Sequence, residues 1–252
     1  MKNKRGQVAI FIILGIALLV LILFLFRENI FSVIYTPKDP SSSVQECVKT
    51  SVEEALQILE PQGGEINPEL FYMYKGNKLS YLCYTENTIE TCVMQTPLVT
   101  KSVATEIENY IRPSVEECLE SVKQNQIGKG YEVSMQTPNI TVTLVPNAVQ
   151  VIVDSDFTMK KEDITQSYKS IKTEVSSKLY ELSMIAMSIL NWEAYYGEAV
   201  SMNYMLYYPK IKVEQYKQGE GTIVYILSDR TTNEKFMFAS RSLVVPVGIT
   251  GE

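Results

Sequence analysis

The chain of 252 residues contains no histidine. Histidine is the commonest general base near neutral pH and the commonest nitrogen ligand of metal ions, so a Ser-His-Asp or Cys-His catalytic arrangement is excluded. The sequence also lacks a G-x-S-x-G elbow, a Walker loop and a glycine-rich dinucleotide fingerprint. We therefore expect no catalytic residue, no cofactor and no metal ion.

Positive charge is scarce relative to negative charge. Three of the 23 basic residues precede the long apolar run described next, whereas all 29 acidic residues follow it, so the portion beyond that run carries a formal charge of −9. Nucleic-acid binding needs a basic surface, so we expect no nucleic-acid partner.

One long uncharged run dominates the amino-terminal region. Residues 8–26 read VAIFIILGIALLVLILFLF, and Lys2, Lys4 and Arg5 precede them. Nineteen apolar residues make a helix of about 28 Å, which is enough to cross the hydrocarbon core of a bilayer. Basic residues stay on the cytoplasmic side. The sequence predicts a permanent transmembrane helix over 8–26, a cytoplasmic segment over 1–7, and an extracytoplasmic remainder.

The front edge of this run carries a second signal. Lys4-Arg5-Gly6-Gln7 before an apolar helix resembles the class III signal of archaeal pilins and archaellins, which implies cleavage between Gly6 and Gln7. Two features depart from a true pilin. Phe11 stands where pilin-like subunits place a glutamate, and the prolines at 37 and 40 would stop the amino-terminal helix early.

All four cysteines lie beyond the apolar run. An even number of cysteines in an oxidising compartment predicts two disulfides, with three connectivities open. We prefer Cys83 with Cys92, which closes a short loop, and Cys47 with Cys118, which ties two helices. Asn139 begins an N-x-T sequon and is a candidate glycosylation site.

Three groups of acidic residues are candidate chemical sites. Such groups on helices and turns are more often solvated than functional, and we expect that here. The two pairs that could serve a glycosidase are Glu53-Glu54 and Glu116-Glu117, and the candidate calcium ligands are Asp154, Asp156, Glu162 and Asp163.

The first half of the extracytoplasmic portion alternates helical and strand-like patterns. A short stalk is expected over 27–44, a helix over 44–59, a hairpin around Lys75-Gly76-Asn77, and a helix over 98–123 that Pro113 could kink or split. Roughly the first half of the chain carries the series Cys47, Glu54-Ala55-Leu56, Gln62-Gly63-Gly64, a tyrosine-rich hairpin and Glu116-Glu117-Cys118-Leu119. With this series it resembles uncharacterised membrane-anchored envelope proteins of DPANN archaea, which also begin with a K/R-G-Q segment. The resemblance implies an archaeal envelope protein and brings no known activity.

The second half begins after a polar boundary at 126–130. Strands are expected over 131–135, 140–145 and 149–153, and a long helix over 161–196. The later half of this helix, LYELSMIAMSILNW, is apolar on most faces and is expected to lie deep in a core. A meander follows, with strands over 207–216, 222–227 and 235–239 and an edge strand over 243–247 that contains Pro246.

Tyrosine and tryptophan gather in one place. Aromatic side chains with a polar tip are enriched at interfaces, although covering a core edge is the commoner role. The candidate partner surface comprises Trp192, Tyr195, Tyr196, Tyr204, Tyr207 and Tyr208.

Together these features predict an α+β protein in which one transmembrane helix holds a disulfide-stapled extracytoplasmic domain with antiparallel sheets and one long helix. We expect two parts in that domain, 45–125 and 126–252. The expected role is non-enzymatic, in adhesion, scaffolding or surface assembly, with the bilayer contacted through 8–26 and protein partners or self-association at the surface. The alternatives are a filament subunit processed after Gly6 and a carboxylate enzyme acting on surface polymers.

Overall fold

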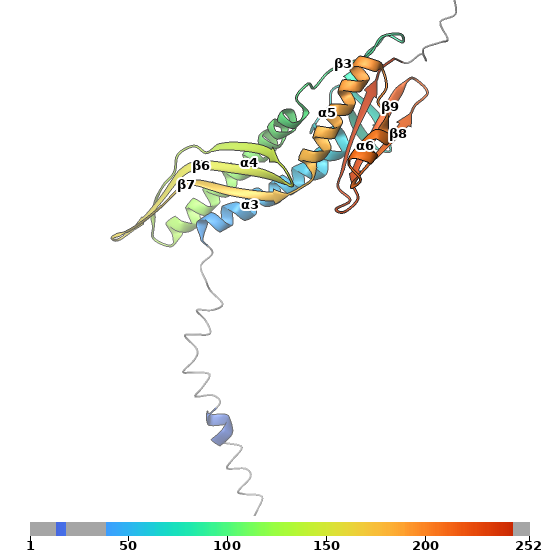
Figure 1. Ribbon diagram of the computed structural model, residues 1–252. Coiled ribbons are helices and arrows are strands. Elements are labelled where there is room, and N and C mark those ends of the chain that lie inside the picture. The colour runs from blue at the N-terminus through green and yellow to red at the C-terminus, as the bar shows by residue number, and fades with distance from the viewer. Residues whose placement is uncertain (1–13, 19–38, 244–252) are drawn as a thin grey trace, which may run out of the picture. The chain divides into compact units, whose positions relative to one another are not determined.

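The computed structural model describes residues 14–18 and 39–243, and the chain divides into two units, Met1–Asp39 and Pro40–Glu252 (Figure 1). In the first unit, residues 14–18 are helical. The rest of the expected transmembrane run, the candidate cleavage site at Gly6 and Gln7, and stalk residues 27–38 lie outside the described residues. Within the described ranges, no helix has the length and apolar character needed to cross a bilayer.

The second unit starts with two packed helices joined by a disulfide. The structure has α3 over Pro40–Leu59, followed by the 3-10 helix η1 over Glu60–Gln62, and α4 over Val99–Gly128. Cys47 and Cys118 are bonded, and the Ser51 and Ser114 hydroxyls lie 2.8 Å apart across the same interface. This is the disulfide preferred from the sequence.

One sequence expectation about these helices was wrong, and one question that the sequence left open is answered. The helix α3 begins at Pro40, so residues 40–44 belong to it and not to a stalk. Proline suits the first turn because its fixed φ is helical and its missing N–H would have no partner there. Pro113 does not divide α4, which runs unbroken for 30 residues, and the Ser114 hydroxyl donates to the Ile111 carbonyl at 2.9 Å in the turn around it.

The two helices cover one face of a four-stranded antiparallel sheet. Its strands are β4 over Glu132–Ser134, β5 over Asn139–Val145, β6 over Ala148–Lys161 and β7 over Ile164–Ser176. The long strand β6 pairs with β7 along one edge and with β5 and β4 along the other. Figure 1 shows α3 and α4 running behind β6 and β7, and α3 contacts β7 while α4 contacts β5.

The expected helix over 161–196 was wrong in its first half, which is the strand β7. Ile164, Tyr168, Ile171 and Val175 have helical spacing, but burial in the structure alternates, with Ile171, Thr173 and Val175 inside. Registered pairing with β6 decides the outcome, because tertiary contacts override a short helical pattern. The long helix of the fold is α4, and only Leu179–Tyr196 is helical here, as α5.

The second sheet has six strands in the order β1-β2-β10-β9-β8, with β3 also paired to β2. The strands are β1 over Phe71–Tyr74, β2 over Asn77–Tyr84, β3 over Val93–Met94, β8 over Ile211–Lys217, β9 over Thr222–Asp229 and β10 over Lys235–Arg241. All pairs are antiparallel except β10 with β2. The expected hairpin at Lys75-Gly76 is confirmed, with φ of 48° and 89° at those two residues.

The helix α5 packs against the inner face of this second sheet and touches the first sheet and α4 as well. Its buried residues join one continuous core with α3, α4 and both sheets. The mixed α+β architecture with antiparallel sheets, a long helix and two disulfides is therefore confirmed. The second disulfide joins Cys83 on β2 to Cys92, again the preferred pair.

The segment between α5 and β8 also differs from expectation. The short helix α6 spans Ser201–Tyr207, so the strand expected over 207–216 begins only at Ile211. The Tyr208 N–H donates to the Tyr204 carbonyl at 2.8 Å, which closes the helix, and Pro209 has no N–H to continue it. Most of the expected edge strand over 243–247 lies outside the described residues.

Candidate interaction surface

The exposed side chains of α5 are mostly apolar or aromatic and none of them is charged, which is unusual for a helix at a protein surface. Between Leu179 and Tyr196 only Glu181 and Glu193 are charged, and Glu193 is fully buried. Met184, Trp192 and Tyr195 lie exposed on the outer side. Helices on globular proteins ordinarily place charged and polar residues on that side. The outer side of α5 therefore has the composition of a contact face.

The helix α6 extends this face. A glycine, Gly197, ends α5 with a φ of 82°, and its N–H donates to the Glu193 carbonyl at 3.0 Å. The chain then turns back into α6, which exposes Met202, Leu206 and Tyr207. Glycine suits this position because it adopts a left-handed conformation without strain. The turn thus places the outer residues of the two helices next to each other.

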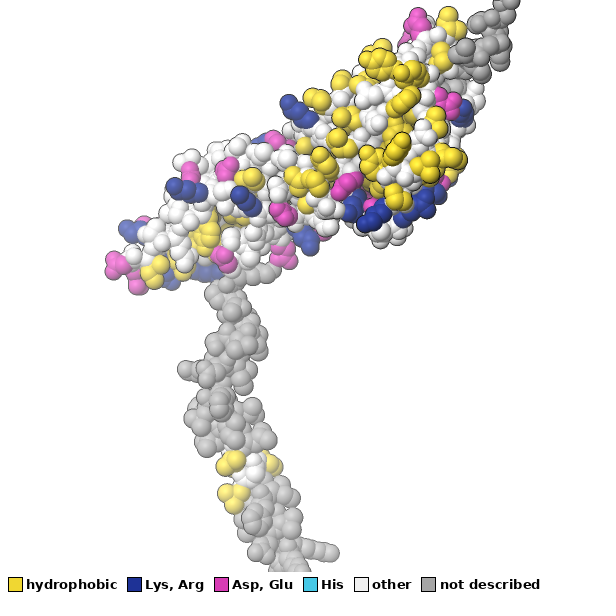
Figure 2. Space-filling view, viewed as in Figure 1, with side chains coloured by type: hydrophobic (Ala, Val, Ile, Leu, Met, Phe, Trp, Pro, Cys, Tyr) yellow, Lys and Arg dark blue, Asp and Glu magenta, His cyan; other side chains and the backbone are white. Residues whose placement is uncertain are grey.

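We call this region the aromatic surface. Figure 2 shows hydrophobic side chains gathered over α5 and α6. The ring of Trp192 lies 4.8 Å from that of Tyr196, and Tyr195 lies 6.3 Å from Tyr196. The aromatic surface consists of Met184, Trp192, Tyr195, Tyr196, Val200, Met202, Leu206, Tyr207 and Tyr208, all exposed.

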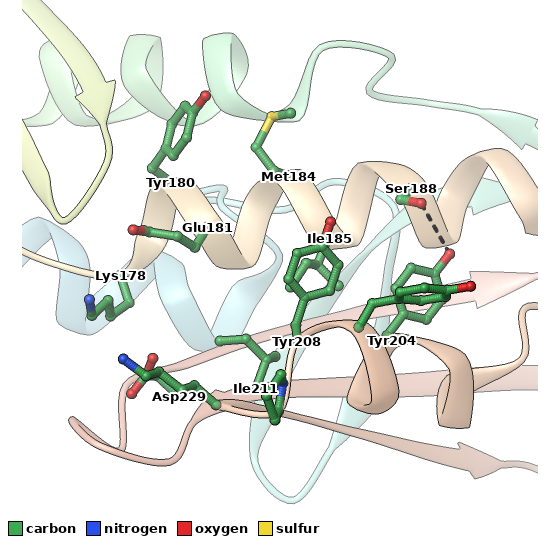
Figure 3. Close-up of a pocket in the computed structure, with 13 residues that line it drawn as sticks. Lys178, Tyr180, Glu181, Met184, Ile185, Ser188, Tyr204, Tyr208, Ile211 and Asp229 are labelled. Carbon is green, nitrogen blue, oxygen red and sulfur yellow. Dashed lines mark hydrogen bonds between the residues drawn. The ribbon is translucent and has the colours of Figure 1, made fainter.

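Two adjoining hollows indent this surface. The larger, of about 660 Å³, lies between α5, α6 and the start of β8 (Figure 3). The smaller, of about 500 Å³, is lined by Trp192, Val200 and Asn203. Both are lined by Ser188, Tyr204, Tyr207 and Tyr208. The hollows therefore lie along α5 with tyrosines between them.

Of the six aromatic residues proposed from the sequence, the structure exposes five and buries Tyr204. Tyr207 is the most exposed, at 81%. The Tyr204 hydroxyl lies 3.2 Å from the Ser188 hydroxyl, and burial raises the pKa of Tyr204 above its usual value. Tyr204 is thus a buried residue that lines both hollows, and the other five rings are available to a partner.

The polar end of the larger hollow is occupied by internal bonds. The Glu181 carboxylate accepts from the Asn147 N–H at 3.1 Å, and its other oxygen is buried and bonds to none of the residues that the structure describes. The Asp229 carboxylate accepts from the N–H groups of Thr231 and Thr232. Burial acts to raise the pKa of Asp229, but these bonds outweigh it and hold the pKa below its usual value. Asp229 is therefore an ionised turn residue.

A buried carboxylate anchors the inner side of α5. Glu193 has no exposed surface and accepts hydrogen bonds from the Tyr225 hydroxyl, from the Ser240 hydroxyl at 3.1 Å and from the Ala199 N–H at 3.3 Å (distances to oxygen). Burial raises its pKa to about 7, and the three hydrogen bonds oppose that shift. The Ser242 hydroxyl also donates to the Glu193 carbonyl at 2.8 Å. These bonds tie the helix to β9 and to β10 and the residue after it.

Among the carboxylic acids that the structure describes, the only other one with a strongly raised pKa is Glu60, on η1. Burial, and secondarily the charge of Glu234, raise its pKa to about 8. Glu234 itself accepts from the Ser177 hydroxyl at 3.0 Å and from the Lys178 N–H at 2.5 Å, at the start of α5. A carboxylate suits a helix amino terminus electrostatically. Neither acid lines either hollow.

The acidic residues that the sequence offered as candidate sites are exposed to solvent. Glu53-Glu54 and Glu116-Glu117 are exposed on α3 and α4, and Asp154, Asp156, Glu162 and Asp163 are exposed on and beside the β6–β7 hairpin. No cluster of three metal-ligating side chains occurs in residues 14–18 and 39–243. Asn139 is exposed at the start of β5, so the sequon is accessible.

Sequence reasoning missed the aliphatic part of the aromatic surface and the whole Glu193 network. Met184, Ser188, Trp192 and Tyr195 recur at three- and four-residue steps, so a helical projection could have grouped them. The partners of Glu193 come from strands far along the chain, and no local pattern signals them.

Comparison with known proteins gives no match: no protein-family model, no curated protein and no solved structure matches this chain. The function is therefore argued from the site alone.

Proposed function

We propose that this chain is a membrane-anchored envelope protein that displays its folded unit outside the cell and uses the aromatic surface for non-enzymatic assembly, as an adhesion or scaffolding element. The observation that carries the proposal is the exposed, uncharged outer side of α5 together with α6. Large exposed apolar patches on soluble domains mark interaction sites. Tyrosine and tryptophan are also the residues that dominate binding energy at interfaces.

Anchoring is supported by the apolar run over 8–26 and the basic residues before it. An exterior location is supported by the two disulfides, which leave no free cysteine in the chain. Disulfides persist in oxidising compartments and are rare where glutathione keeps thiols reduced.

A non-enzymatic role is supported by the state of the acids near the hollows. The carboxylates of Glu181 and Asp229 already accept hydrogen bonds from backbone N–H groups of the protein. The pair Glu60 and Glu234 has one raised pKa, as an acid catalyst would need, but Glu234 is engaged by the first turn of α5. Catalysis by this pair would require a substrate to displace those bonds.

Protease treatment of intact cells tests the location. We expect proteinase K to degrade residues beyond the apolar run without lysis, and alkylation under non-reducing conditions to modify no cysteine. A protected domain with four alkylated cysteines would refute the proposal.

Mass spectrometry of the mature amino terminus tests the filament alternative. A chain that starts at Gln7 would support processing after Gly6. A chain that starts at Met1 or Lys2 would contradict processing and support a permanent transmembrane anchor.

A further inference from the structure

The geometry points to a second copy of this chain as the partner: we propose that the aromatic surfaces of two copies pack against each other in a symmetric dimer. The inference rests on the proposed function, because anchoring in one membrane would hold copies side by side at high effective concentration. Area, charge and shape each support the second copy.

The exposed area is large enough for a stable dimer. Tyr195 and Tyr207 are 78% and 81% exposed, and Leu206 is 74% exposed. An aromatic side chain has about 150–250 Å² of surface. The nine side chains of the aromatic surface together expose on the order of 1,000 Å², against about 800 Å² per partner in a standard interface. Partial burial of this surface would therefore suffice.

The charge pattern suits pairing with itself. A two-fold interface brings a surface against its own copy, so unpaired charges near the axis would face like charges. Three acidic residues occur between 179 and 208, and each is engaged internally. Glu181 accepts from Asn147, Glu193 is buried, and the Glu198 carboxylate pairs with the Lys217 ammonium at 2.8 Å. The chain carries a net charge of −6, yet none of the nine side chains of the aromatic surface is charged.

The contour would also allow the surface to pack against its own copy. Tyr207 is 81% exposed and lines both hollows. In a two-fold dimer the Tyr207 ring of each copy would insert into a hollow of the other copy. The same ring and the same hollow would then make contact twice, once on each side of the axis. A flat lipid surface would leave the hollows unfilled, which is why we favour a protein.

Photocrosslinking in the full-length protein tests the proposal. Benzoylphenylalanine replaces Tyr207 by stop-codon suppression, and cells that produce two differently tagged copies are irradiated. The control places the same probe at Ile164, which is 64% exposed at the β6–β7 hairpin. We expect a product of twice the 28.6 kDa chain mass that carries both tags, from position 207 only. Crosslinked peptides should map to α5 and α6.

Each other outcome would refute the proposal that the partner is a second copy of this chain. A product that contains a different protein would leave the proposed function standing and replace the partner. A lipid adduct at monomer mass would assign the surface to the membrane. No product at all would leave the aromatic surface without a partner of this kind.

A charge variant provides an independent measurement. Leu206→Glu would place two carboxylates at the proposed contact, and we expect the yield from a probe at Tyr195 to fall by about tenfold or more. The control is Met73→Glu, because Met73 is exposed on β1 away from the aromatic surface. Migration on non-reducing gels verifies that both disulfides form. An unchanged yield in the Leu206 variant would contradict the dimer.

Discussion

The buried Glu193 makes a quantitative prediction about how stability depends on pH. Its pKa is raised from 4.5 to about 7 in the folded protein, chiefly by burial. Between these two values the folded state holds a proton that the unfolded chain has released. The contribution of Glu193 to the free energy of unfolding should therefore be highest below pH 4.5, fall as pH rises to about 7, and then level off. A shift of about 2.5 units corresponds to about 3 kcal/mol.

Replacing Glu193 by glutamine tests this reasoning. Glutamine keeps the shape, can still accept from the Tyr225 hydroxyl, and does not ionise. We expect the free energy of unfolding of Glu193→Gln to lack this decline, so that the variant gains up to about 3 kcal/mol relative to the natural protein between pH 4.5 and pH 8. Glu60 titrates in both proteins, so its contribution cancels.

Urea unfolding of the full chain in mild detergent, followed by circular dichroism at several pH values, measures the difference. The single tryptophan, Trp192, provides a second probe on the same helix. The control is Glu53→Gln, at an exposed position of α3, which should leave the profile unchanged. Parallel profiles for the natural protein and Glu193→Gln would refute the assignment of a strongly raised pKa to this carboxylate.

Three further changes have expected outcomes. Replacing Cys47 and Cys118 together by alanine opens a link between residues 71 apart and should lower the free energy of unfolding by about 4 kcal/mol in urea, more than loss of the shorter bridge. Gly197→Ala should destabilise by about 1 kcal/mol or more in the same assay, because φ is 82° and the added Cβ would lie 2.5 Å from the Cβ of Leu243, whereas Gly219→Ala meets no atom within 4 Å and should be nearly neutral. Tyr225→Phe removes a donor from the buried carboxylate, so the pKa of that carboxylate should rise further, and a carboxylate infrared band should report it.

Local signals in the sequence predicted much of the fold. The Lys75-Gly76 hairpin, the strands around Asn147 and the helix from Val44 to Leu59 each depend on neighbours in the chain, namely turn residues and a single periodicity. The prediction for the segment that forms β7 was wrong because its apolar residues fit both a helical and a strand periodicity. Only the strand β6, which precedes it, decides between them, and pairing strength is not visible in one segment.

The candidate site was predictable in composition but not in exposure. The segment that ends at Trp192 is apolar on most faces of a helical projection, and this pattern predicts a position deep in a core. One side of the helix is indeed in the core, since Leu182, Ile185 and Ile189 are buried. Which side of the helix faces solvent depends on how much sheet is available to cover it. That quantity is set by residues far away in the sequence.

A helix that is apolar on both sides needs something other than hydrophobicity to set its rotation, and Glu193 supplies it. Turning α5 about its axis would still bury large apolar side chains, such as Met184 and Trp192, but it would remove the buried carboxylate from the hydroxyls of Tyr225 and Ser240. Leaving such a group without donors costs more than a hydrogen bond contributes. The network thus selects the rotation in which Trp192, the residue next to Glu193, faces solvent. The acid that lowers stability at neutral pH is accordingly the group that holds the aromatic surface in position.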